Sequence, residues 1–530
     1  MRIMVNNTRK VGCIGGYTPQ FLYTKDKLFF ETLDLFFVSI YNKYVTYFFK
    51  EVEEMAKVET SIEELEAKQF VKMTKTPIAK LIIGLGIPTT LSMMVTSLYN
   101  LADTYFVSMI GNDDVTAAVS NLLALMSIIQ AIGFTFGMGS GAIISTLLGK
   151  RDREGANKVG SSAFASACLC GLFVLIFGFI FLTPLMRLFG SRSTDVLKYS
   201  KEYATYILFA APFMCMSFVL NNILRAEGKP TLSMVGLVVG ALVNVVLDPL
   251  LIFALKLGVA GAALATAISQ FTSFCILLSM FLSGKTIIRL RLKAVSRTAS
   301  VYKNIIITGF PSFCRQILAS LCTVFLNQAA FKYGQLAYGE GGGAATQAAL
   351  GVVQKFFMLA FSLSLGIGQG YQPVLGYNYS AERYDRVRAA YRFTLTFAVC
   401  MMVLFAVVCF IFAENLMQMF SLSSTAAEIG TLTLRFQCMC MPLLPFNFMV
   451  SITYQSVGNK GIATLLSISR QGLFYIPFVL LLPVLMGLKG VQCCQAVSDL
   501  FAFVFALPFT VLFFKQLKKA EQKKIEREQA

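Results

Sequence analysis

Two residue types are missing from this chain of 530 residues: it has no histidine and no tryptophan. The lack of histidine excludes histidine-based metal sites and imidazole proton relays. The lack of tryptophan means that aromatic residues at a membrane interface would have to be tyrosine or phenylalanine. Charged residues are also scarce, at 14%, whereas a soluble globular chain has about 25%. A soluble protein is therefore excluded.

Apolar residues are abundant where charged residues are scarce. They account for 56% of the chain, and the mean hydropathy is +0.67. Since about 20 apolar residues cross a bilayer as a helix, we expect an all-α polytopic membrane protein. From Ile78 onward, apolar blocks alternate with short polar breaks and predict twelve transmembrane helices, near 78–107, 115–146, 162–184, 203–224, 231–254, 258–282, 302–331, 344–371, 393–412, 430–457, 462–486 and 490–514.

The excess of basic residues gives a net charge of +18, and the distribution of these residues among the loops explains it. Lysine and arginine gather in every second loop, so we predict a multi-pass protein of the cytoplasmic membrane with both termini cytoplasmic. No nucleic acid partner is implied. The 13 cysteines lie mostly within apolar segments and lack zinc-site spacing, so we interpret them as small packing residues.

The chain repeats itself. Gly86 and Pro88 return as Gly309 and Pro311, and the glycine run 137–141 returns as 366–370 at nearly the same shift. Each repeat holds six helices, an even number, which predicts two parallel pseudo-symmetric six-helix lobes. That architecture is typical of a carrier with its substrate path between the lobes. Because neither glycine run follows a strand or ends in Lys-Ser/Thr, we interpret both runs as helix packing.

The repeat divides the chain into five predicted parts. The first is a cytosolic extension, partly disordered or preceding a true start at Met55 or Met73. The full division is the extension 1–75, a first lobe 76–284, a cytoplasmic linker 285–303, a second lobe 304–515 and a basic cytoplasmic tail 516–530.

Acids inside predicted spans are costly and therefore mark candidate sites. Asp103 lies roughly 33 Å along its helix and Asp248 roughly 26 Å along another, both running outward, so both fall at similar depth in the outer half of the first lobe. Asn244 shares a helix face with Asp248, and Thr266 lies at the same depth. Two carboxylates, an amide and a hydroxyl predict an oxygen-rich cage for Na⁺ or a transferable proton. The alternatives are an interfacial Asp103 and an Asp248 that accompanies a helix kink.

The second half differs, because neutral residues replace these acids. Within its predicted spans it carries one acid, Asp499, which we expect to neutralise a neighbouring cation. The cations deep within these spans are Arg315, Lys355, Arg435 and Arg470.

Residues 77–519 resemble the multidrug and toxic compound extrusion (MATE) family, nearest to its bacterial MepA-like branch. The motifs that carry the resemblance are Gly86-Ile-Pro88, Leu98-Tyr-Asn-Leu-Ala-Asp103, the run 137–141, Gly149-Lys-Arg-Asp152, Asn221-Asn-Ile-Leu-Arg-Ala-Glu-Gly228, Asn244-Val-Val-Leu-Asp-Pro249, Gly258-Val-Ala-Gly-Ala-Ala-Leu-Ala-Thr266 and Ser469-Arg-Gln471. The resemblance implies two six-helix bundles that form a V.

It also implies an exporter of organic cations and drugs driven by H⁺ or Na⁺, working without a cofactor. Asp103, Asn244, Asp248 and Thr266 match the family's cation site. The family's accessory positions around that site correspond to Pro88, Tyr206 and Asn221 in this chain. Some relatives carry acids in the seventh and tenth spans, where this chain has Gln316 and no acid, so a second-lobe ion site is in doubt.

We therefore predict a monomeric, cation-coupled multidrug antiporter that works by alternating access. The main alternative is a lipid-linked precursor flippase, which would use Arg315, Lys355, Arg435 and Arg470 as a cationic cavity for pyrophosphate. A membrane-embedded enzyme is disfavoured, because the sequence has no histidine and no paired catalytic motif.

Overall fold

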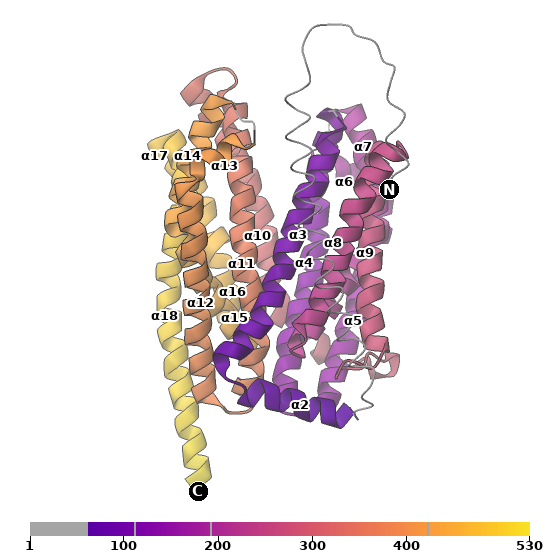
Figure 1. Ribbon diagram of the computed structural model, residues 1–530, viewed down its shortest axis with the longest axis vertical. Helices are drawn as coiled ribbons and strands as arrows, with labels where there is room; N and C mark the ends of the chain where they lie inside the picture. Colours follow the sequence, from indigo (N-terminus) through magenta and orange to yellow (C-terminus); the bar gives the residue numbers. More distant parts are fainter. Residues whose placement is uncertain (1–61, 111–112, 191–192, 421–422, 530) are drawn as a thin grey trace, which may run out of the picture. The chain divides into compact units, whose positions relative to one another are not determined.

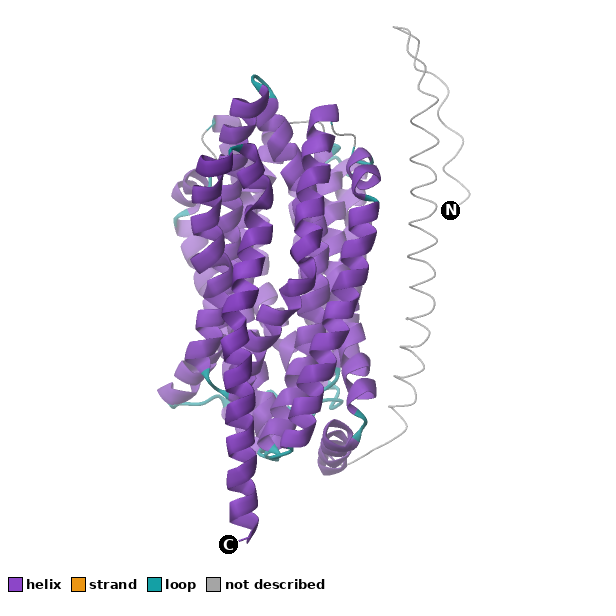
Figure 2. Ribbon diagram, turned by 90° about the vertical axis from the view of Figure 1, so that its left-hand side faces the viewer, coloured by secondary structure: helices purple, strands orange, loops and turns teal. Residues whose placement is uncertain are grey.

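The computed structural model describes residues 62–110, 113–190, 193–420 and 423–529. Glu66–Ala530 forms one compact unit. The predicted extension before residue 62 lies outside the described residues. The described chain is helical, with short connecting loops (Figure 2).

The first lobe is preceded by α2 (Ile62–Lys75). Its six long helices run in colour from indigo to pink in Figure 1. Their bounds, with one short helix and one π-helical turn, are α3 (Ile78–Ser108), α4 (Asp113–Gly149), α5 (Arg153–Ile180), α6 (Leu182–Leu188), α7 (Thr194–Ala226), α8 (Pro230–Pro249), η1 (Leu250–Ala254) and α9 (Gly258–Leu282).

The second lobe follows the 3₁₀ turn η2 (Leu292–Ala294) and runs from salmon through orange to yellow in Figure 1. Two of its spans are interrupted, one by a 3₁₀ turn and one by a π-helical segment. The elements are α10 (Ala299–Tyr338), α11 (Gly342–Ser380), α12 (Tyr384–Ile411), α13 (Ala413–Gln418), α14 (Ser424–Cys440), η3 (Met441–Leu443), α15 (Leu444–Val457), α16 (Lys460–Ile468), η4 (Ser469–Tyr475), α17 (Ile476–Met486) and α18 (Leu488–Gln529).

Twelve of the described helical segments are long and apolar enough to cross a membrane. The predicted all-α fold class is therefore confirmed. Some helices exceed their predicted spans: α10 ends at Tyr338 and α18 at Gln529. Hydropathy detects only the apolar part of a helix, whereas Lys, Glu and Gln continue it into water at little cost. The lobe limits 76–284 and 304–515 stay predictions.

Large apolar side chains cover the outside of both lobes. Phe173 and Ile180 on α5 are 65% and 68% exposed, and Val484 on α17 is 69% exposed. A patch of this extent would be unfavourable in water but is the expected surface of a helix that faces lipid.

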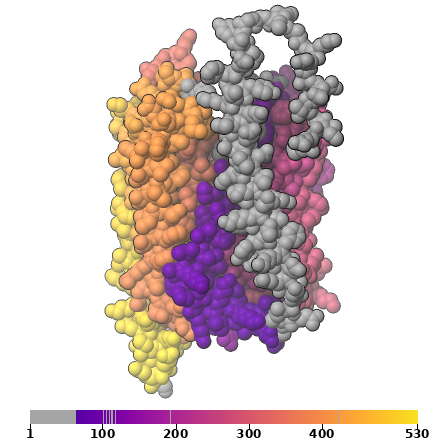
Figure 3. Space-filling model, viewed as in Figure 1, coloured from indigo at the N-terminus to yellow at the C-terminus, as the bar shows by residue number. Residues whose placement is uncertain are grey.

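The two lobes meet along a seam of glycines. A Cβ atom on Gly309 of α10 would lie 1.8 Å from the Thr135 carbonyl oxygen of α4, and one on Gly366 of α11 would lie 2.3 Å from the Thr90 Cα of α3. In Figure 3 the indigo part of the first lobe lies directly against the orange part of the second. In the run 137–141, a Cβ atom on Gly139 would lie 2.3 Å from the Ile305 carbonyl oxygen of α10. Both glycine runs thus serve close helix packing, which confirms that interpretation.

The seam lies toward one end of the helices. Gly370, near the end of α11, faces Gly86, near the start of α3, at 2.6 Å from a built Cβ to the Gly86 Cα. The end of α4 likewise meets the end of α11, where a Cβ on Gly149 would lie 2.7 Å from the Tyr377 carbonyl oxygen. The lobes are therefore closed at the end that holds the linker 285–303.

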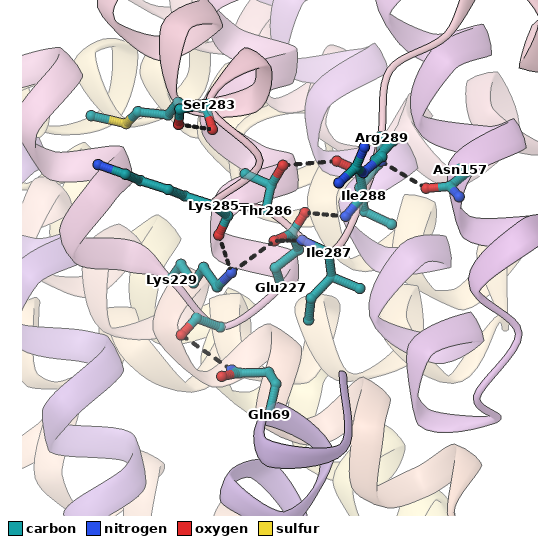
Figure 4. Close-up of polar contacts among 12 residues, drawn as sticks. Gln69, Asn157, Glu227, Lys229, Ser283, Lys285, Thr286, Ile287, Ile288 and Arg289 are labelled. Carbon is teal, nitrogen blue, oxygen red and sulfur yellow. Dashed lines mark hydrogen bonds and ion pairs between the residues drawn. The ribbon is translucent and has the colours of Figure 1, made fainter. Parts of the chain in front are cut away.

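A buried glutamate anchors that linker. The Glu227 carboxylate is fully buried and accepts hydrogen bonds from the backbone N–H groups of Ile287 and Ile288, each at 2.9 Å (Figure 4). Lys229 Nζ lies 3.7 Å from Glu227 Oε2. Burial raises the pKa of Glu227, although Lys229 and the two N–H groups act to lower it.

Candidate functional site

A polar cluster lies within the first lobe, where α8 packs against α9. Asn244 and Asp248 are both fully buried, and Thr266 is 6% exposed. Asn244 Nδ2 donates to Asp248 Oδ1 at 3.2 Å and lies 3.5 Å from Thr266 Oγ1. The four-residue spacing places Asn244 and Asp248 on one face of α8, as the sequence predicts.

Helix α3 adds the second acid. It packs against α8, and Asp103 lies close enough to Asp248 to interact with it electrostatically. The Oδ1 atom of Asp103 is buried. The structure therefore brings together all four residues proposed for the cation site, from three helices.

Three oxygens of this cluster have no hydrogen-bond partner among the described residues. They are Asp103 Oδ1, Asn244 Oδ1 and Asp248 Oδ2, and all three are buried. Buried polar atoms are nearly always satisfied, and oxygen is the ligand atom that Na⁺-like hard cations prefer. The arrangement suits a bound cation or a proton shared between the carboxylates.

The helix carrying Asp248 is irregular just beyond it. Pro249 has no N–H to donate to the Val245 carbonyl, and the π-helical turn η1 follows directly. Such π-helical turns are frequent at functional sites because they free backbone groups from regular bonding. The Val245 carbonyl, three residues before Asp248, therefore lacks its regular helical donor.

Two of the three accessory residues, Pro88 and Asn221, lie apart from this cluster. Pro88 lies on α3 at the inter-lobe seam, between Gly86 and Thr90. Tyr206 is half-buried on α7. Asn221 donates to the Ser233 carbonyl near the start of α8, at the opposite end from Asp248, so the structure does not bring it to the cage.

Sequence reasoning missed the tyrosines beside the cage. Tyr99 and Tyr203 both lie close enough to Asp103 and Asp248 to interact electrostatically. Gln270 Nε2 lies 3.5 Å from the Tyr99 hydroxyl. A signal was available: Tyr99 precedes Asp103 by four residues and Gln270 follows Thr266 by four, which places each pair on one helix face.

The second lobe holds a different kind of site. A small cavity, partly open to its surroundings, is lined by residues Arg315, Phe361, Ser364, Leu444, Asn447, Phe448, Ser451, Ser467, Arg470 and Gln471.

Asp499 and Arg470 form a buried ion pair beside this cavity. Arg470 Nε lies 2.7 Å from Asp499 Oδ1, and Gln495 Nε2 donates to the same oxygen at 3.1 Å. This confirms that Asp499 neutralises a neighbouring cation.

The other two second-lobe cations do not line the cavity. Lys355 lies over the Phe420 ring and Arg435 over the Phe410 ring, at 5.5 and 5.8 Å from the ring centroids. Of the four cations in the predicted spans, the structure therefore gathers Arg315 and Arg470.

Twelve membrane-length helices in two repeated lobes, with a polar cluster buried inside the first, define a membrane transporter. The MatE family model matches residues 88–250 and 320–481, one match in each lobe. The chain belongs to the MatE family.

Two similar proteins match this chain over most of its length. The chain is 25% identical over 431 residues to the multidrug export protein MepA of Staphylococcus aureus, strain MRSA252, with 81% of this chain and 92% of MepA covered. The MepA protein of Staphylococcus saprophyticus is 25% identical over 86% of this chain and 98% of its own length.

Among solved structures, an outward-facing multidrug resistance MATE transporter of the MOP superfamily matches with a TM-score of 0.79 and 27% identity, covering 85% of this chain and 98% of its own. A MOP superfamily transporter from Pyrococcus furiosus, described as having a binding pocket of reversed polarity, matches with a TM-score of 0.78 and 27% identity, covering 85% and 99%. Both solved structures therefore share the fold of this chain.

Proposed function

We propose that this transporter is a cation-coupled antiporter that exports organic cations and lipophilic drugs in exchange for inward H⁺ or Na⁺. The observation that carries the proposal is the set of three buried oxygens, on Asp103, Asn244 and Asp248, that have no hydrogen-bond partner in the described part of the chain. Two carboxylates this close repel each other unless a cation or a proton lies between them.

Coupling requires that the ion and the drug favour different arrangements of the lobes. In the structure the lobes are packed together at the linker end by the glycine seam. Binding of a cation between α3 and α8 would pull these two helices together, and Pro88 lies where α3 enters the seam. A bend of α3 at Pro88 would then transmit ion binding to the contact between the lobes.

The proposal includes an orientation with both termini in the cytoplasm, supported by the basic loops at the linker end. In a variant without other cysteines, Leu292→Cys in the linker would label only from the cytoplasmic side. Met419→Cys, whose side chain is 76% exposed between α13 and α14, would label only from outside. The reverse pattern in intact cells with an impermeant maleimide would overturn the orientation.

The flippase alternative is weaker. It calls for a strongly cationic cavity for pyrophosphate, but the second-lobe cavity is lined by Arg315 and Arg470 without Lys355 or Arg435. Lipid II flipping by purified protein in liposomes would restore this alternative.

The test of the exporter proposal is transport in proteoliposomes. Ethidium, a flat organic cation, would be the probe, and the Na⁺ and proton gradients would be imposed separately. We expect one gradient or both to drive ethidium against its own concentration gradient. Equal ethidium movement with and without either gradient would contradict coupling.

A further inference from the structure

The second-lobe cavity contrasts in charge with the first-lobe cage. Its lining includes two arginines and no acid; the remaining polar side chains are hydroxyls and amides. Apolar walls come from Phe361, Leu444 and Phe448. Asp499 does not line the cavity.

Arg470 is one of the two arginines that line this cavity. The residue is 8% exposed, and its Nε is engaged by Asp499. Its Nη2 atom is buried and has no hydrogen-bond partner among the described residues. A buried guanidinium nitrogen without an acceptor is costly, so an acceptor supplied by a ligand would relieve that cost.

Arg315 has no carboxylate within ion-pair distance in the described part of the chain. Its Nη2 lies 3.5 Å from Met138 Sδ, a weak acceptor, and its guanidinium lies 5.0 Å from the centroid of the Phe448 ring. These contacts hold the side chain in place without neutralising it. Since Asp499 compensates only one arginine, the cavity keeps about one uncompensated positive charge.

Ser364 adds a further group. The residue lines the same cavity, and its Oγ atom is buried and has no hydrogen-bond partner among the described residues. Two arginines and a serine around one space suit an oxygen anion, because guanidinium donors match carboxylate and phosphate geometry. Phe361, Leu444 and Phe448 would contact an apolar portion of the same molecule.

We propose that this cavity binds the oxyanionic group, carboxylate or phosphate, of an amphiphilic molecule, held between Arg315 and Arg470. The proposal concerns binding alone and does not depend on cation-coupled drug export. The amphiphile would be either a soluble molecule or a membrane lipid.

The test is calorimetric titration of the full-length protein in neutral detergent. Octyl phosphate would be the probe, and octyltrimethylammonium, with the same chain and the opposite charge, the control ligand. We expect saturable binding of octyl phosphate. Arg315→Gln should weaken it about tenfold or more, whereas Arg435→Gln, which removes an arginine outside the cavity, should leave it unchanged.

A second variant keeps the test decisive if the Arg315→Gln protein misfolds. The pair Arg470→Gln with Asp499→Asn removes the other guanidinium without leaving a buried acid unpaired, and it should weaken octyl phosphate by a similar factor. No saturable binding by the unaltered protein would overturn the proposal. So would an equal loss in the Arg315→Gln and Arg435→Gln proteins, or a loss of octyltrimethylammonium binding that matches the loss of octyl phosphate.

A further arm identifies the source of the oxyanion. The titration is repeated in nanodiscs of zwitterionic lipid with and without phosphatidic acid. Weaker octyl phosphate binding in the presence of phosphatidic acid supports the proposed site with a lipid as its occupant. Unchanged binding supports the site with a soluble amphiphile.

Discussion

The two lobes share an architecture but carry opposite charge inside it. The polar cluster of the first lobe contains two acids and has three oxygens without hydrogen-bond partners among the described residues, whereas the acid beside the second-lobe cavity is already paired with Arg470. In each lobe the polar site lies next to a π-helical segment in the fifth span, η1 beside Asp248 and η4 around Arg470. The repeated fold therefore supplies a position for a site, and the side chains decide which charge that site accepts.

The same residue type thus serves two roles. One Asp248 oxygen accepts no hydrogen bond from the residues that the structure describes, as a residue that binds and releases an ion needs. One oxygen of Asp499 accepts hydrogen bonds from Arg470 and Gln495, and the carboxylate compensates the fixed positive charge of Arg470. Substituting each acid should separate these roles.

The largest effect on stability is expected for Asp499→Asn. The amide would leave Arg470 buried without its counter-charge, which costs about 3–5 kcal/mol. Protein yield and thermal stability should both fall, and Arg470→Gln in the same chain should restore much of the loss. Normal abundance and stability with abolished transport would instead give Asp499 a direct coupling role and break the contrast between the lobes.

A smaller effect is expected where the lobes meet. Gly309→Ala would place a methyl group on the Thr135 carbonyl oxygen across the seam, and such overpacking costs about 1–3 kcal/mol. Gly84→Ala is the matched control, since no atom lies within 4 Å of a Cβ built there. Thermal unfolding of both purified variants would measure the difference. Equal stability would mean that the seam does not hold the lobes together.

The smallest effect concerns the linker between the lobes. Because burial raises the pKa of Glu227, the folded protein holds this proton more tightly than the unfolded chain does. The resulting stability is fully present below the ordinary carboxyl pKa and is lost as pH rises through the raised value.

Thermal unfolding across the mildly acidic range would measure that loss. Unaltered protein should lose stability with rising pH relative to Glu227→Gln, and the comparison uses the slope because the amide also changes the contacts to Ile287 and Ile288. Glu154→Gln, at an exposed position on α5, should keep the slope of the unaltered protein. A Glu227→Gln protein with that same slope would contradict the linkage.

The sequence was sufficient for the twelve spans, because the length and apolarity of a transmembrane helix are local properties. It was also sufficient for the cluster of Asp103, Asn244, Asp248 and Thr266, since helix spacing and depth along the helix can be counted. The sequence did not indicate that Tyr99 and Tyr203 lie beside this cluster. For Tyr99, the four-residue spacing to Asp103 could have indicated it.

The depth of each second-lobe cation along its helix does not show whether its side chain lines the cavity. Which of Arg315, Lys355, Arg435 and Arg470 face a common cavity depends on how each helix is rotated about its axis, and the π-helical segment η4 shifts that rotation at Arg470. The placement of Asn221 failed for a related reason: its amide reaches the near end of α8 rather than the end that holds Asp248. The anchoring of the linker by Glu227 depends on loop geometry, which has no periodic signal in the sequence.

Gradient-driven ethidium export by Asp103→Asn and Asp248→Asn proteins in proteoliposomes tests the central claim, a cation site in the first lobe, most directly. Asp195→Asn, at an exposed position in the first turn of α7, is the matched control. We predict that each site variant folds, since a neutral amide is cheaper to bury than a carboxylate, and retains ethidium binding in detergent. Export should fall to the level of protein-free liposomes in both, with no further loss in the double variant, because the two acids act as one site. Near-normal export by either single variant at normal abundance would contradict the account.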